Sequence, residues 1–340
     1  MRVEMLHDPV LFAQLADEWS ALLRRSVVDT LFLTPRWQQV WWRHFGAGLC
    51  LRMLLARDDS GALLGIAPLY AKEEAGQIVL QFVGGVDVSD YLDFIVARGL
   101  EEEIYRAFLN YLLREAPPWD LLDLHCLPGH SPTGAGLLCQ VCAECCPGGV
   151  SAEREEAAPY IPLPGDWESY LEGLDKKQRH EIRRKLRRAE AEAEVRWERL
   201  QDASGLGGAV NNFLALHRAS HPEKDAFMTP AMEAFFREMA AVTWTAGWLN
   251  LYTLWLDGRP AAAMWCFDYG GDLLVYNSGY DPAYRPELSA GNVLLSYCIQ
   301  DAIARGKRRF DFLRGGETYK YRLGAVDSAV YHLVIRNPRS

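Results

Sequence analysis

The sequence contains one order of structural elements twice, and this internal duplication limits the folds open to the chain. In the first half, Leu51–Ala56, Leu63–Tyr70 and Ile78–Val83 have the patterns of strands, and a helical segment and a further strand follow. The same order begins again at Leu249–Leu256 and ends at Arg309–Leu313. Solenoid repeats recur every ~20–50 residues. A repeat of this much greater length therefore predicts two duplicated domains.

Each copy predicts an α/β domain. Three antiparallel strands followed by a helix and a further strand are typical of a mixed, mainly antiparallel sheet flanked by helices. The chain has 340 residues, enough for two domains of ordinary size. The segment Gly148–Pro164 is rich in Gly, Pro, Ala and Glu. We therefore place the boundary there and expect domains at residues 1–155 and 156–340.

Composition and the N-terminal sequence indicate a folded protein of the cytoplasm. Hydrophobic residues make up 49% of the chain and charged residues 24%, which is typical of globular domains. The sequence has no uninterrupted apolar run of about 18 residues, so we expect no membrane span. The N-terminus lacks the apolar stretch of a secretory signal. We therefore expect a cytoplasmic protein.

The chain has eight cysteines, which we expect to be free thiols in a reducing compartment. Four of them, Cys139, Cys142, Cys145 and Cys146, form overlapping C-x-x-C spacings that could suggest a metal site. Helical spacing behind the apolar segment Gly136–Leu138 instead favours a buried face. We expect a structural role for them and no metal.

A strongly basic segment lies within this acidic protein. Most residues from Lys176 to Arg188 are Lys or Arg, and the pattern predicts one long helix over 175–194. The net charge of −9 argues against a dedicated nucleic-acid-binding protein. Two interpretations remain open for the helix. It is either a solvated helix near the domain junction, or a positive wall for a phosphate-bearing substrate such as a nucleotide, coenzyme A or tRNA.

The segment Lys307–Arg322 concentrates polar and aromatic residues just after a predicted strand. Gly315 and Gly316 follow the strand, and paired glycines there permit a sharp turn or close approach to a ligand. Glu317, Tyr319 and Lys320 follow at once. We predict a functional site here, with a solvated hairpin tip as the alternative.

Five segments, in a consistent order, resemble a known family. They are Phe32–Phe45, Gly61–Tyr70, Ser89–Val96, the basic helix and Ala290–Ala325. Together they resemble tandem GNAT-fold acetyltransferases of the BioF-like and CelD-like family, which is related to the FemA/FemB/FemX aminoacyl ligases. The resemblance covers nearly the whole chain. It implies two GNAT-like domains and the transfer of an acyl group to an amine.

The resemblance also implies that acyl-CoA is the co-substrate, with its pyrophosphate on the N-terminus of the helix after the third strand. The residues it assigns to this site are Ser278, Gly279, Tyr280, Arg285, Ser289, Ala290, Gly291 and Asn292. The loop Arg285–Gly291 departs from the usual pattern because it has one glycine and carries Glu287. Fem-type ligases lack a working loop at this place and use aminoacyl-tRNA.

Lys320 is the first candidate for catalysis, because Fem-type ligases have a lysine near the reacting carbonyl in this segment. A fixed ammonium would stabilise the developing oxyanion, and loss of such a donor costs about 2.7–4 kcal/mol. The alternative is a surface lysine paired with Glu317 at i, i+3. Asp311 and Glu317 are the candidate bases. Tyr319 either donates a hydrogen bond to the acyl carbonyl or packs.

The first domain is expected to lack a donor site, because the acidic stretch at 101–103 would repel pyrophosphate. It would shape the acceptor cleft, with Asp90, Tyr91, Trp37 and Trp41 as contacts, although core packing is the commoner role for such residues. Arg314 is a further candidate contact.

The leading hypothesis is an N-acyltransferase acting on an amine of a small molecule, an amino sugar or an envelope precursor. Two alternatives remain. One is an aminoacyl-tRNA-dependent ligase, and the other is an inactive duplicated protein that binds a ligand.

Overall fold

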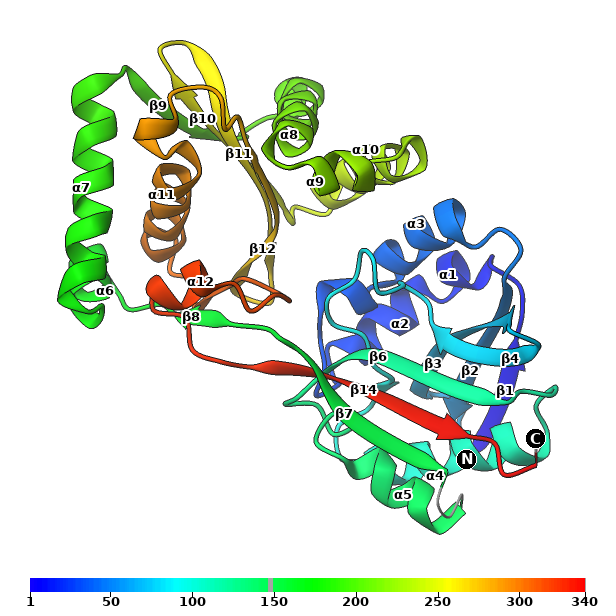
Figure 1. Ribbon diagram of the computed structural model, residues 1–340. Helices are drawn as coiled ribbons and strands as arrows, with labels where there is room; N and C mark the ends of the chain where they lie inside the picture. Colours follow the sequence, from blue (N-terminus) through cyan, green and yellow to red (C-terminus); the bar gives the residue numbers. More distant parts are fainter. Residues whose placement is uncertain (146–148, 340) are drawn as a thin grey trace. The chain divides into compact units, whose positions relative to one another are not determined.

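The computed structural model describes residues 1–145 and 149–339, and its contacts divide the chain into two compact units (Figure 1). Unit 1 comprises Met1–Ala157 together with Ser328–Ser340, and unit 2 comprises Ala158–Asp327. The expected division at residues 155 and 156 lies close to the first crossing of the chain. It needs correction at the C-terminus, because the last strand is hydrogen-bonded into the sheet of unit 1.

Unit 1 contains one mixed sheet. Its strands lie in the order β1 (Arg2–Leu6), β2 (Cys50–Arg57), β3 (Leu63–Glu74), β4 (Gln77–Phe82), β6 (Leu121–Pro128), β14 (Ala329–Arg336) and β7 (Val150–Ala157). The short β5 (Ile95–Val96) pairs with β3. Along this order, only β4 and β6 run parallel, with Val79 opposite Leu121.

Two groups of helices flank this sheet. Figure 1 shows α1 (Leu11–Gln14), α2 (Ala16–Leu23) and α3 (Pro35–Phe45) on one side, and α4 (Glu101–Arg114) and α5 (Leu137–Cys145) on the other. A 3₁₀ turn, η1 (Leu31–Leu33), precedes α3.

Local signals explain the start of α3 but not the first helices. The Thr34 hydroxyl accepts a hydrogen bond from the Trp37 amide at 3.2 Å, and Pro35 is the first helical residue. Thr followed by Pro is a typical N-cap and first-residue pair, so the sequence alone predicts this start. The helical spacing of apolar residues from Asp8 or Pro9 to Arg25 predicts one continuous helix, but the chain breaks between α1 and α2 at Leu15, whose backbone is not helical.

Unit 2 also contains a mixed sheet. Its order is β8 (Tyr160–Pro162), β13 (Arg309–Asp311), β12 (Asp272–Tyr280), β11 (Arg259–Tyr269), β10 (Leu249–Leu256) and β9 (Val195–Arg199). Strands β12 and β13 are parallel and the other neighbours are antiparallel. Short turns add η2 (Ala203–Gly205) and η3 (Pro286–Leu288).

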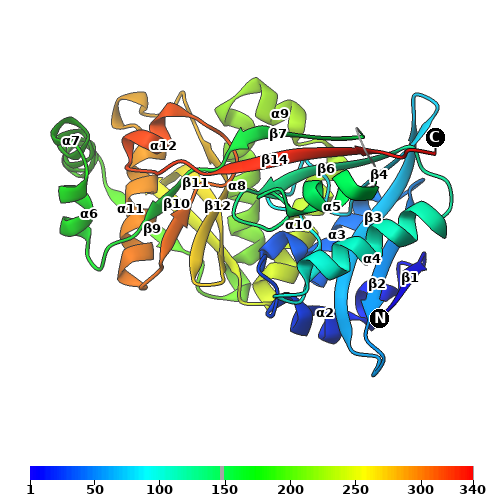
Figure 2. The ribbon, with the colours of Figure 1, turned by 90° about the horizontal axis from the view of Figure 1, so that it is seen from below.

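The helices of unit 2 cover both faces of its sheet (Figures 1 and 2). On one side lie α6 (Trp167–Gly173), α7 (Lys176–Glu192) and α11 (Ala290–Ala304), and on the other α8 (Leu206–Ser220), α9 (Pro222–Phe227) and α10 (Pro230–Thr245). The short α12 (Thr318–Arg322) follows β13. Helix α7 is the predicted basic helix, and the Asp175 carboxylate caps it by accepting from the Gln178 amide at 3.0 Å.

The duplication is confirmed. Both units contain three antiparallel strands, a helix and a strand parallel to the third, namely β2-β3-β4-α4-β6 and β10-β11-β12-α11-β13. In each unit a strand from outside this run pairs antiparallel with its last strand: β14 with β6, and β8 with β13. In unit 1, β7 then forms the edge beyond β14. The chain therefore consists of two duplicated domains, each with a mixed sheet flanked by helices, as expected.

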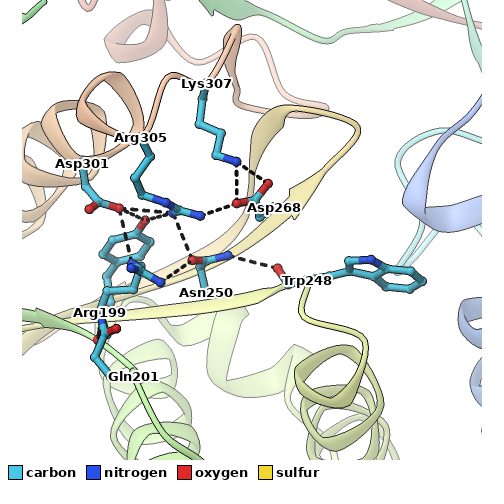
Figure 3. A network of polar contacts seen from close by, with 9 residues as sticks. Arg199, Gln201, Trp248, Asn250, Asp268, Asp301, Arg305 and Lys307 are labelled. Carbon is cyan, nitrogen blue, oxygen red and sulfur yellow. Dashed lines mark hydrogen bonds and ion pairs between the residues drawn. The ribbon is translucent and has the colours of Figure 1, made fainter.

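A network of charged and polar side chains fixes the C-terminal end of α11 (Figure 3). The Arg305 guanidinium donates to Asn250 at 3.1 Å, to Asp301 at 3.3 Å and to Asp268. Lys307 donates to the same Asp268 carboxylate at 2.7 Å. Cations at a helix C-terminus also interact favourably with its dipole. The network therefore holds α11 against β10 and β11, which leaves its opposite end beside β12.

No helix in the described ranges 1–145 and 149–339 has the length and apolar character needed to cross a lipid bilayer. Of the clustered cysteines, Cys142 is buried and Cys139 is partly buried, and both are free thiols. The Cys145 side chain and all of Cys146 lie outside the described residues. A structural role for the whole cluster stays a prediction.

Candidate functional site

The parallel strands of unit 2 separate soon after they meet. Strand β13 pairs with β12 only at Leu273 and Leu274 and ends at Asp311, whereas β12 continues to Tyr280. A bulge in the pairing of β12 with β11 lies opposite Trp265 and Cys266. Bulges often occur next to active sites because they redirect side chains and end regular pairing. The last residues of β12 are therefore open on the side that β13 leaves.

A cavity of about 660 Å³ lies at this open end, within the usual size range of small-molecule sites. It contains all eight residues that the family resemblance assigned to the donor, which are Ser278, Gly279, Tyr280, Arg285, Ser289, Ala290, Gly291 and Asn292. Its lining also includes residues of β11, Lys224, Asp281, Glu317 and Tyr319. The structure thus brings this predicted set together in one place.

The N-terminus of α11 offers unpaired backbone donors to the cavity. The amides of Asn292 and Val293 donate to the Ser289 carbonyl, at 2.9 and 3.1 Å. No acceptor among the described residues pairs with the amides of Ala290 and Gly291, and both residues line the cavity. Free N–H groups and the helix dipole together favour an anion at this place.

The charges of the loop before α11 are paired with one another and with neighbouring residues. The Arg285 guanidinium donates to Glu287, Asp257 and the Glu192 carbonyl, each at 2.8 Å. Glu287 does not line the cavity. Glu287 departs from the usual pattern of this loop, but Arg285 holds its carboxylate outside the cavity, so it does not place negative charge at the phosphate position. Arg285 in turn has its charge balanced within the fold.

Lys320 is buried and its ammonium is occupied. The side chain is 3% exposed, and Nζ donates to the carbonyls of Phe312, Arg314 and Gly315 at 3.3, 2.9 and 2.8 Å. Nζ also lies 2.8 Å from the Glu317 carboxylate. The pairing with Glu317 was predicted, but for a lysine on the surface of the protein. Lys320 does not line the cavity, and its contacts show a residue that holds together the loop after β13.

Gly315 is required by this arrangement. Its φ is +113°, and a Cβ atom there would lie 2.4 Å from Glu317 Oε2 and 2.9 Å from Lys320 Nζ. A side chain at this position would therefore displace the ion pair. The absence of a side chain at Gly315 therefore permits a close approach, but the approaching group is the Lys320–Glu317 ion pair rather than a ligand.

Besides Arg285, a second cation lines the cavity: Lys224, on α9. Its Nζ donates to the Ser278 carbonyl at 2.6 Å. Burial lowers the pKa of Lys224, and the Glu317 carboxylate partly opposes this. Sequence reasoning missed Lys224, because its short helix lies in residues 195–248, where we predicted no element. The only local signal is His221-Pro222, a cap followed by a first-turn proline.

A neutral histidine lies close to this lysine. His217 on α8 is 1% exposed, and burial together with the Lys224 charge lowers its pKa to about 4. Gly279 permits the contact between α8 and β12, because a Cβ there would lie 2.3 Å from the His217 amide nitrogen. The uncharged imidazole therefore adds no second positive charge beside Lys224.

The other predicted catalytic residues divide into two groups. Glu317 and Tyr319 line the cavity, and Tyr319 packs edge-on against Phe312 with ring centroids 6.0 Å apart. Burial, and then the Glu317 carboxylate, raise the pKa of the Tyr319 phenol. Asp311 does not line the cavity, and its carboxylate accepts from the Leu313 amide at 2.8 Å. Arg314 is also absent from the lining.

The predicted acceptor contacts belong to unit 1. Trp37 is fully buried and donates to the Ser89 hydroxyl at 2.9 Å. Trp41 is 5% exposed and stacks on Tyr70, with centroids 5.5 Å apart. These two are core residues. Asp90 and Tyr91 are partly exposed in the loop after β4 and remain candidates.

One cluster in unit 1 has the residue types of a metal site. Ligand atoms of Asp123, His125 and His332 lie within 4.8 Å of one another. The two imidazole rings stack 3.8 Å apart and 8° from parallel. Since a metal ion binds in the plane of an imidazole, parallel rings must turn before they can share one ion. Burial opposes a charge on His125, but Asp123 and Glu155 raise its pKa to about 9. We interpret the cluster as ion pairs.

Comparison with known proteins agrees with this fold. Residues 176–321, less than half of the chain, match the family model of an acetyltransferase (GNAT) domain. A search of curated proteins finds no match. Among solved structures, FemX is similar over 100% of this chain and 98% of its own, with a TM-score of 0.68 and 13% identity.

Two other solved structures share the architecture. A conserved protein of unknown function from Bacteroides thetaiotaomicron VPI-5482 has a TM-score of 0.62 at 10% identity, covering 98% of this chain and 100% of its own. The structure of L-PGS from Bacillus licheniformis has a TM-score of 0.57 at 11% identity, covering 95% and 92%. At these identities the likeness shows the fold. The expected resemblance is confirmed: residues 176–321 match a GNAT domain, and the whole chain has the fold of FemX.

Proposed function

Because residues 176–321 match an acetyltransferase (GNAT) domain and the whole chain has the fold of FemX, we propose that the protein is an N-acyltransferase. It would move an acyl group from acyl-CoA to an amine of a small molecule, an amino sugar or an envelope precursor. The observation that carries the proposal is the cavity of unit 2. There, an unpaired helix N-terminus and a fixed lysine lie beside an open strand end.

The two ends of this cavity suit the two ends of a thioester donor. The donor pyrophosphate would accept hydrogen bonds from the amides of Ala290 and Gly291. Its acyl carbonyl would lie at the open end of β12, near Lys224. An ammonium held in a cavity stabilises the oxyanion that develops on the carbonyl. In this proposal Lys224 takes the role that the resemblance assigned to Lys320, and Lys320 positions the loop.

The reaction forms one C–N bond and breaks one C–S bond. The acceptor amine attacks the thioester carbon, the coenzyme A thiolate leaves, and the amine loses a proton. The Glu317 carboxylate lines the cavity and would accept that proton. Tyr319 stays protonated because its pKa is raised, so its hydroxyl can donate to the leaving thiolate.

The proposal is tested by mass spectrometry of amine acceptors mixed with several acyl-CoA donors. We expect acyl transfer by the wild type, and a loss of about 10²–10³-fold in kcat for Lys224→Met. Lys176→Met is the matched control, because Lys176 is exposed and lies outside the cavity. Unchanged transfer by Lys224→Met would reject the role of this lysine.

The second candidate is a Fem-like ligase that takes an aminoacyl group from tRNA, and the basic helix α7 favours it. Transfer from aminoacyl-tRNA but from no acyl-CoA would establish that reading. If neither donor binds or reacts, the protein is a duplicated binding protein without this activity.

A further inference from the structure

Half of the Lys and Arg side chains of α7 pair with carboxylates of the same helix or of its neighbour α6. Carboxylates pair with four of its basic side chains, namely Arg183 with Glu168, Arg184 and Lys185 with Glu181, and Arg188 with Glu192. Exposed pairs of this kind contribute little to stability. This part of α7 agrees with the solvated-helix interpretation of the sequence.

Apart from Arg187, which donates to the Arg183 carbonyl, the remaining cations lie near the start of α7. Within the part of the chain that the structure describes, no carboxylate pairs with Lys176, Lys177, Arg179 or, on α12, Arg322. Lys177 and Arg322 are exposed. Unpaired cations that keep their charge available attract phosphate groups.

Lys177 and Arg322 line a groove of about 520 Å³ between α7, α11 and α12. Helix α7 packs directly against α11 (Figure 2). His180 of α7 and Ser296 of α11 also line the groove. Asn292 and Tyr319 line both this groove and the cavity at the end of β12. The groove therefore adjoins the cavity at these two residues, by the first turn of α11.

We propose that this groove binds the nucleotide of the acyl donor, including the 3′-phosphate of coenzyme A. The inference rests on the proposed function and extends it. A donor whose pyrophosphate lies at Ala290 and Gly291 would place its nucleoside at Asn292, where the groove adjoins the cavity. Lys177 and Arg322 supply charge for the 3′-phosphate.

The dimensions and charge of the groove favour a nucleotide over an RNA stem. Its volume of about 520 Å³ matches a compact ligand. Proteins that grip long nucleic acids neutralise many phosphates at once. Here only a few cations are unpaired, and the chain has a net charge of −9.

The test compares ligands that differ by one phosphate. Isothermal titration would measure coenzyme A, dephospho-coenzyme A and 3′,5′-ADP against the wild type and the double variant Lys177→Ala/Arg322→Ala. We expect the wild type to bind coenzyme A about tenfold more tightly than dephospho-coenzyme A, as one good charge-assisted contact allows. The double variant should bind both about equally. The matched control, Lys176→Ala/Arg187→Ala, changes two exposed cations of α7 outside the groove and should keep the wild-type ratio.

Three results would overturn the inference: equal binding of the two coenzymes by the wild type, an unchanged ratio in the double variant, or displacement of 3′,5′-ADP by an RNA acceptor-stem minihelix at lower concentration. Both substituted residues are exposed, so the melting temperature of the variant should be unchanged. Isothermal titration measures binding alone, so its result does not depend on catalysis. Preference for the 3′-phosphate without acyl transfer would reject the proposed function and keep the groove. Acyl transfer with equal binding of the two coenzymes would reject the groove and keep the proposed function.

Discussion

Replacing Lys320 by Met tests whether this residue holds the fold of unit 2 rather than the substrate. Methionine has a similar length and is apolar, so it fills the space but offers no donor. Three carbonyls, those of Phe312, Arg314 and Gly315, lose a charged donor. A buried polar group left without its partner costs about 1–3 kcal/mol. Because part of this loop can reach water, we expect a total of about 3 kcal/mol.

Differential scanning calorimetry would measure the effect. For a domain of 150–250 residues, 1 kcal/mol corresponds to about 2–4 °C, so Lys320→Met should lower the melting temperature of unit 2 by about 6–12 °C. Lys72→Met is the control. Lys72 forms an exposed pair with Glu74 at 2.7 Å, and its loss should cost less than about 1 kcal/mol. Equal shifts for the two variants would refute the assignment of Lys320 to the fold.

Two further predictions concern packing and pH. Gly279→Ala should destabilise unit 2 by more than about 2 kcal/mol, because the new Cβ would lie 2.3 Å from the His217 backbone nitrogen; an unchanged melting temperature would contradict this. Asp93 is completely buried, and burial raises its pKa to about 6 despite a 2.6 Å hydrogen bond from Thr133. The folded state therefore binds this proton more tightly than the unfolded state. The stability of wild type relative to Asp93→Asn should fall by about 3 kcal/mol as pH rises from 4 to 7, whereas a constant difference in urea unfolding would reject the burial argument.

The sequence predicted the elements that depend on local signals. Helix α4 occupies Glu101–Arg114, as its apolar spacing indicated, and α3 begins at the Thr34-Pro35 cap. The repeated order of strands also gave the tandem fold. Helix α8 escaped prediction because Gly207, Gly208 and two asparagines weaken its intrinsic preference for a helix. Its packing against β11 and β12 supplies what the local sequence lacks.

The candidate site shows where sequence reasoning stops. The loop and helix start at 278–292 are contiguous, so the family resemblance could place them together. Lys224 comes from a distant helix and meets Ser278 only in the folded unit. Tyr319 and Lys320 are neighbours in the chain, but successive helical residues point about 100° apart. Tyr319 lines the cavity and Lys320 is buried. Such a difference of direction is invisible without the bounds of α12.

Equilibrium binding of acetyl-CoA to the wild type, Gly291→Ala and Gly291→Glu tests most directly whether α11 holds the donor. A Cβ at Gly291 meets no atom closer than 3.6 Å, and a carboxylate in the first turn of a helix is favourable, so both variants should fold. At about 5 Å and an effective dielectric constant of about 20, a carboxylate beside pyrophosphate costs about 3 kcal/mol. We predict wild-type affinity for Gly291→Ala and a loss of about a hundredfold for Gly291→Glu. Equal binding by all three proteins, or no binding by the wild type, would contradict the account.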